Sequence, residues 1–260
     1  MPQAVVFTLW APFAAMGDIA VGERRVGYDR PGRSAVLGLV SAALGLDRAD
    51  DEAHAALDRD YLMAQRVLHR GDLLQDYHTV QAPPADRKGR WTTRRDALAQ
   101  SRHLLGTLLS VRDYRVAPLA DVALIVRQGG RPQFAPARIA EALRCPVFTL
   151  YFGRKACPLG LPPAPAIIET EALAAAFAAA GSNRTLPARD IIGHLRANSE
   201  NTAVYADIDL TREGRGLDML QSDYRIARVE RRRDGRANRR RWQFELRSEV
   251  VAHPVNGAVQ

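Results

Sequence analysis

The chain has 260 residues, 47% of them hydrophobic, which is enough to bury the core of one large domain or two small ones. No apolar run reaches the roughly 18 residues that a membrane span needs, the N-terminus lacks the basic segment of a signal peptide, and two cysteines are too few for a disulfide framework or a zinc site. We therefore expect a cytoplasmic protein without metal or cofactor. The formal net charge of +8 favours a polyanionic partner. A GC-rich genome would explain why all but two of the 37 basic residues are arginine, but not their excess over 29 acidic residues.

The N-terminal part predicts a strand, a basic loop, two helices and a second strand. Residues 4–10 alternate apolar and mixed side chains and stop before a proline, which is typical of a strand. Residues 34–46 carry apolar side chains at helical spacing, with Ser34 at the N-cap position and Gly45 near the end. Residues 51–71 continue with a helix and then a strand.

The middle of the chain leaves the core and returns to it. Residues 75–103 are polar and basic, and their length predicts an excursion rather than a tight connection. A strand is expected at 121–127 and a short amphipathic helix at 136–144. A proline-rich joint then precedes an alanine-rich helix at 171–181.

Two further strands are expected near the C-terminus, at 224–230 and 241–247, with a hairpin turn at Asp234-Gly235. Strands and helices are mixed without regular β-α-β alternation, which favours an α+β fold. The motifs of nucleotide-hydrolysing enzymes are absent: glycines at 22 and 27 have the spacing of a Walker loop, but Tyr28-Asp29 stands where Lys-Ser/Thr is required.

Four groups of residues are candidates for binding a phosphate backbone or unpaired bases. In the first, Arg24, Arg25, Arg30 and Arg33 lead into the helix at Ser34, whose free amides and dipole favour an anion. The alternative for this group is a solvated loop with an ordinary serine cap. In the second, Tyr77 and His78 are suited to stacking on bases, and His78 also to acting as a general base; the alternative is a histidine satisfied at a strand end.

The third group surrounds Trp91 and consists of Lys88, Arg90, Arg94 and Arg95, which is typical of a single-strand binder, although a disordered surface loop is the alternative.

The fourth group lies in LYFGRKACPLG, residues 150–160, where an apolar run ends in a glycine and two cations. Tyr151, Gly153, Arg154 and Lys155 are expected to grip phosphates at the edge of a strand. A separate arginine cluster, 231–233 with 239–241, is interpreted first as a solvated hairpin tip that adds salt-sensitive attraction.

Four of these segments, in this order, resemble the CasD family of type I-E Cascade subunits in the RAMP superfamily. They are LWAPFAAMG (9–17), PGRSAVLGLVSAALGL (31–46), DYHTV (76–80) and LYFGRKACPLG (150–160). The last is similar to a Tyr-x-Gly-Arg-Arg-x-Cys-Pro-Leu signature, with Lys155 replacing the second arginine and so changing a bidentate fork to a point charge. The final hundred or so residues resemble the family only loosely.

The resemblance implies a ferredoxin-like, RRM-related RAMP domain at 1–160 and a small β-rich part at 161–260. A basic "thumb" insertion at about 81–101 would project onto the neighbouring backbone subunit. The implied function is a non-catalytic subunit that binds the 5′ handle of CRISPR guide RNA within an antiviral Cascade complex. The implied partners are the backbone and large subunits, the guide RNA, and target DNA.

Two alternatives stay open at this point. Relatives in type I-C systems are metal-independent endoribonucleases that process precursor CRISPR RNA with tyrosine, lysine and histidine side chains, and His78 is the candidate here. A basic scaffold that binds no RNA by itself is the other alternative. The main interpretation requires the cations at 24–33, 88–95 and 154–155 to converge on one unpaired ribonucleotide tail.

Overall fold

The computed structural model describes residues 1–17, 22–83, 91–99, 102–129, 131–180, 186–197, 202–211, 218–221, 223–238 and 243–255. Its centre is an antiparallel seven-stranded sheet, sheet A, in the order β10-β11-β9-β4-β7-β1-β8. The strands are β1 (Gln3–Trp10), β4 (Tyr61–His69), β7 (Leu119–Val126), β8 (Ala166–Glu169), β9 (Ala203–Asp207), β10 (Tyr224–Asn238) and β11 (Gln243–Pro254).

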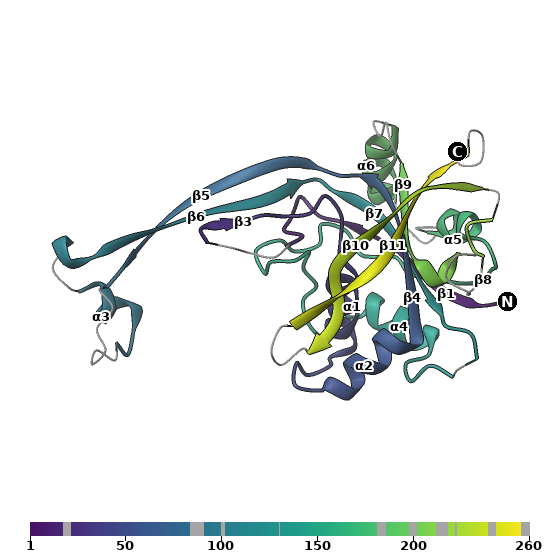
Figure 1. Ribbon diagram of the computed structural model, residues 1–260, viewed down its shortest axis with the longest axis horizontal. Helices are drawn as coiled ribbons and strands as arrows, with labels where there is room; N and C mark the ends of the chain where they lie inside the picture. Colours follow the sequence, from purple (N-terminus) through teal and green to yellow (C-terminus); the bar gives the residue numbers. More distant parts are fainter. Residues whose placement is uncertain are drawn as a thin grey trace.

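Helices cover both faces of sheet A (Figure 1). One face carries α1 (Arg33–Leu44), α2 (Asp51–Asp60) and α4 (Pro136–Arg144), and the other carries α5 (Leu173–Ala179) and the short helix η2 (Ile208–Leu210). Helix α6 (Leu186–Ala197) packs near β4.

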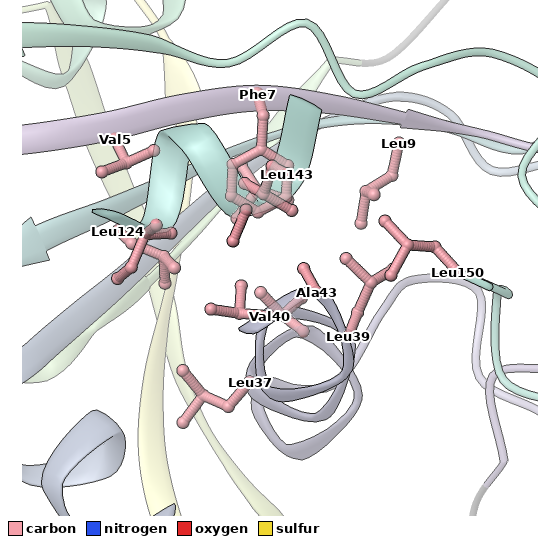
Figure 2. Packing of buried hydrophobic residues seen from close by; sticks show 14 of the residues in the cluster. Val5, Phe7, Leu9, Leu37, Leu39, Val40, Ala43, Leu124, Leu143 and Leu150 are labelled. Atoms are coloured by element: carbon pink, nitrogen blue, oxygen red, sulfur yellow. The ribbon is translucent and has the colours of Figure 1, made fainter. Parts of the chain in front are cut away.

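The larger core lies under α1 and α4. Alternation along β1 sends Val5, Phe7 and Leu9 to this face, where they meet Val40 of α1 and Leu143 of α4, as Figure 2 shows. Neighbouring residues of β1 point the other way, into a second core under α5. The sheet is therefore a middle layer, and α1 is held firmly against one side of it.

The elements β1, α1, β4, β7, α4 and β8 follow the β-α-β-β-α-β order of a ferredoxin-like unit. Strands β9, β10 and β11 extend the same sheet beyond β4. Residues beyond 160 thus contribute β8, β9, β10 and β11 to sheet A. The mixture of helices with antiparallel strands confirms the predicted α+β class.

A long hairpin, which we call the arm, projects from the sheet (Figure 1). It is formed by β5 (Asp72–Ala82) and β6 (Gly106–Val116), and α3 (Arg94–Leu98) and η1 (Arg102–Leu104) lie between them in the chain. The short strand β2 (Phe13–Ala14) pairs with β6 at its base, and β3 (Arg24–Arg25) pairs with it a few residues further out, at Val111 and Arg112. The projection is thus longer than the expected 81–101, because both flanking segments are continuous strands.

Two local predictions were wrong. Gly32, not Ser34, occupies the N-cap position of α1, and Ser34 lies inside the helix. Gly235 pairs with Glu245 inside the β10–β11 ladder, next to a register shift, so the Asp-Gly pair marks a bulge and not the hairpin turn. Among the described residues, no helix is long and apolar enough to cross a membrane.

Candidate nucleic-acid interface

The loop after Leu150 is a compact, anchored structure. Tyr151 forms a bridge with Pro158, the Phe152 amide donates to the carbonyl of Cys157 at 2.7 Å, and the Cys157 amide donates to the carbonyl of Arg154 at 2.8 Å. Phe152 and Cys157 are buried, while Tyr151 and Lys155 are exposed. Burial raises the pKa of the Cys157 thiol despite the nearby charge of Arg154. Cys157 therefore acts as a neutral anchor, and the loop presents Tyr151 and Lys155 outward.

Gly153 is the residue that lets this loop approach the rest of the protein. Its φ of +91° lies in the region that glycine favours, and a Cβ added there would lie 1.9 Å from the carbonyl oxygen of Ala15. The Ala15 amide donates to the carbonyl of Phe152 at 3.0 Å. The loop is therefore held directly against the segment that follows β2.

Arg154 is fixed next to the base of the arm. Its guanidinium lies over the ring of Tyr114 of β6, 4.7 Å from the centroid. Its Nη1 atom is buried and has no hydrogen-bond partner among the residues that the structure describes. A buried guanidinium nitrogen without an acceptor is costly unless a ligand supplies one, and phosphate oxygens are well matched to it.

A cavity of about 400 Å³ lies beside Arg154. Ser34, Ala35, Gly38 and Ala42 of α1 form part of its lining, and their small side chains leave the helix surface open. Tyr151, Gly153 and Arg154 line it from the loop, and Asp234 and Phe244 line it from β10 and β11. The space is large enough for a flat ring such as a nucleobase, with a phosphate on the arginine.

Arg24 and Arg25 lie close to this site. Both are exposed on β3, which pairs with Val111 and Arg112 of β6. Tyr114, which contacts Arg154, is two residues beyond Arg112, and this places β3 on the order of 10 Å from the arginine by strand geometry. The basic residues of β3 and the loop at residues 151–158, which we call the Gly-Arg-Lys loop, therefore lie against the same strand of the arm.

Arg30 and Arg33 form ion pairs inside the protein. Both are buried. Arg30 donates to Glu249 at 2.9 Å and to Glu230 at 2.7 Å, and Arg33 donates to Asp207 at 2.6 Å. These bonds join segments about two hundred positions apart in the sequence and use donors of both guanidinium groups within the protein.

The N-terminus of α1 is likewise occupied from within the chain. The Asp234 carboxylate of β10 accepts from the Arg33 amide at 2.8 Å, and Arg247 donates to the same carboxylate at 2.7 Å. Buried Arg247 would have a lowered pKa, but Asp207, Asp234 and Glu249 together raise it. The expected anion site at the helix terminus is thus filled by an internal carboxylate. Ser34 remains at the cavity as a lining residue.

The other predicted residues lie on the arm, away from the cavity. Tyr77 is 62% exposed on β5, and the His78 imidazole contacts the Asp76 carboxylate. Trp91 and Arg95 are exposed near the far end. Arg94 contacts the carbonyl of Gln81, which is paired with Thr107, about 23 Å along β6 from Tyr114 by strand geometry. Lys88 and Arg90 lie outside the described residues.

Of the three groups of cations expected to converge, β3 and Arg154 both lie against β6, whereas Trp91, Arg94 and Arg95 lie far along the arm. Sequence reasoning missed the stacking partner Tyr114 and the cavity wall contributed by Phe244. No local signal identifies these two residues, since both depend on pairing between distant segments. No group of three metal-binding side chains occurs among the described residues.

The chain matches the model of a family of CRISPR-associated proteins (Cas_Cas5) over residues 4–248. It therefore belongs to that family. A curated relative, "CRISPR system Cascade subunit CasD" of Escherichia coli (strain K12), is 28% identical over 174 residues, covering 62% of this chain and 70% of the relative.

Two solved structures share the fold. One, titled "CRISPR RNA-guided surveillance complex", aligns with a TM-score of 0.56 and 17% identity over 98% of this chain and 92% of that chain. The other, titled "Crystal structure of Cas protein", aligns with a TM-score of 0.53 and 17% identity over 98% of this chain and 97% of that chain.

Proposed function

We propose that this protein is a CRISPR RNA-binding subunit of a type I-E Cascade complex. The unpaired tail of the bound RNA would lie between the Gly-Arg-Lys loop and α1. The observation that carries this proposal is Arg154, which lines a cavity of about 400 Å³ and whose Nη1 is buried without an acceptor among the described residues. A phosphate supplies the acceptor, and the neighbouring cavity holds a base.

The surrounding residues support the same assignment. Tyr151 and Lys155 are exposed beside Arg154, and Arg24 and Arg25 add positive charge at the base of the arm. An exposed aromatic ring with several cations is what unpaired RNA requires, because bases stack on rings and phosphates pair with cations. The family membership and the E. coli relative agree with a place in Cascade. The backbone and large subunits, target DNA and a cytoplasmic location belong to the same proposal.

The test is a fluorescence-anisotropy titration of the purified chain with RNA of a type I-E CRISPR repeat, which we call the repeat RNA. Arg154→Ala removes charge-assisted hydrogen bonds, so the affinity falls by roughly 10- to 100-fold. Arg138→Ala is the matched control, because Arg138 is exposed on α4 and pairs only with Glu141 among the described residues. Equal affinities of the two variants would contradict the proposal, and equal binding of scrambled RNA would favour a nonspecific scaffold.

A non-catalytic role is part of the proposal. His78, the candidate for the endoribonuclease alternative, has its Nε2 engaged by Asp76. Its cross-strand partner Ser110 lies about 13 Å along β6 from Tyr114. Labelled repeat RNA incubated with the protein without divalent metal should stay intact. Discrete cleavage that disappears in His78→Ala would establish the nuclease instead.

A further inference from the structure

The distal half of the β10–β11 hairpin has one face that the proposed RNA site does not use. Only Glu249–Ala252 of β11 pair with β9, so Arg231–Asn238 and Gln243–Ser248 continue beyond the sheet as a two-stranded ribbon. Figure 1 shows this ribbon extending past α1. Its inner face is occupied, because Arg232, Asp234 and Arg247 are buried or ion-paired there.

Alternation along the strands sends Arg231 and Arg233 to the opposite, outer face. Both are exposed, and neither forms a hydrogen bond or ion pair with another described residue. Val229 and Leu246, 45% and 53% exposed, flank them. This outer face, defined by Val229, Arg231, Arg233 and Leu246, lies on the α5 side of sheet A, whereas the cavity lies on the α1 side.

The local charge of residues 225–247 favours a polyanionic ligand. Residues 225–247 contain ten arginines and three acidic residues, which gives a local charge of +7 out of the whole chain's +8. Arg231 and Arg233 are two residues apart on one strand, so their side chains emerge about 6.6 Å apart from a rigid surface. Such a row suits repeated phosphates better than the irregular charges of a protein surface.

The side chains between the arginines favour a duplex over a single strand. Unpaired bases need aromatic rings to stack on, and the four residues of the outer face include none. Aliphatic side chains contact sugars instead, and a duplex carries a higher density of phosphate charge than a single strand. We infer that the outer face of the ribbon binds the phosphate backbone of double-stranded DNA, independently of its base sequence. This surface stands apart from the proposed RNA site.

The experiment compares two double variants of the full chain that change the net charge equally. One is Arg231→Glu with Arg233→Glu, and the control is Arg131→Glu with Arg138→Glu, two exposed arginines elsewhere. Each is titrated with a random-sequence DNA duplex of about 20 base pairs at several salt concentrations. The ribbon variant should bind roughly tenfold or more weakly at low salt, and the slope of log affinity against log salt should decrease by about 1.8, for two lost phosphate contacts.

Two more double variants separate the charge of the arginines from the folding of the ribbon. Arg231→Lys with Arg233→Lys keeps the charge and should keep the slope, and Arg231→Gln with Arg233→Gln replaces the glutamate variant if that one misfolds. Binding of the repeat RNA should be unchanged in the ribbon variants. The inference is overturned if the control loses as much duplex affinity as the ribbon variant, if neither loses any, or if single-stranded RNA binding falls as much as duplex binding.

Discussion

Replacing Gly153 by alanine tests how the Gly-Arg-Lys loop is held. At a φ of +91° the new Cβ would lie 1.9 Å from the Ala15 carbonyl oxygen, a backbone atom that cannot rotate away. The loop must therefore move, and the 3.0 Å bond between the Ala15 amide and the Phe152 carbonyl is lost with it. Strain of about 1–3 kcal/mol and a hydrogen bond worth about 1 kcal/mol give a loss of about 2–4 kcal/mol in the free energy of unfolding.

The assay is urea unfolding followed by circular dichroism, alongside the RNA titration. Gly17→Ala is the matched control, because no atom lies within 4 Å of a Cβ at Gly17; its free energy should stay within about 0.5 kcal/mol of the wild type. Gly153→Ala should also bind repeat RNA more weakly, since Arg154 moves with the loop. If Gly153→Ala is as stable as Gly17→Ala and binds the repeat RNA as tightly as the wild type, the loop is not held in the way described.

Further substitutions test the core, the buried ion pairs and their pH dependence. Arg33→Met removes one ion-pair partner of the Asp207 carboxylate and should lower the free energy of unfolding in urea by about 3–5 kcal/mol. A decrease below about 1 kcal/mol would contradict a structural role for Arg33 and favour ligand binding. Leu124 is fully buried and is labelled in Figure 2, and Leu124→Ala should cost about 2–5 kcal/mol. Leu108→Ala on the exposed arm should cost less than about 0.5 kcal/mol. Burial alone would raise the pKa of Glu230, but bonds from Arg228 and Arg30 lower it overall. Ionised Glu230 should stabilise the folded state fully at neutral pH. This stabilisation should fade as the pH falls below the pKa of Glu in the unfolded chain, about 4.3, towards the lower pKa of Glu230 in the folded protein. The stability difference between wild type and Glu230→Gln should therefore shrink in acid, and a constant difference from pH 7 to 3 would contradict this.

Local patterns predicted the elements that depend on nearby residues. The helix expected at 136–144 coincides with α4, and those expected at 34–46 and 171–181 differ from α1 and α5 by one or two residues at each end. In each, apolar spacing is set by the helix's own period and needs no distant partner.

The strands of the arm and the contacts between distant segments were not predictable. The polar residues of β5 and β6 carry no core pattern, because the arm leaves the core and is stabilised by pairing with itself. Arg33 and Asp207 are 174 positions apart, so nothing local distinguishes a buried arginine from one that meets a ligand. The cavity and the stacking of Arg154 on Tyr114 arise in the same way, from the packing of separate segments.

Photo-cross-linking gives the most direct test of the RNA site. The intact chain would be irradiated with repeat RNA containing 4-thiouridine, and the attached peptides identified by mass spectrometry. The proposed path of the RNA predicts cross-links within residues 151–155 and along α1, around the open cavity. Cross-links confined to other surfaces, with none in those two segments, would contradict it.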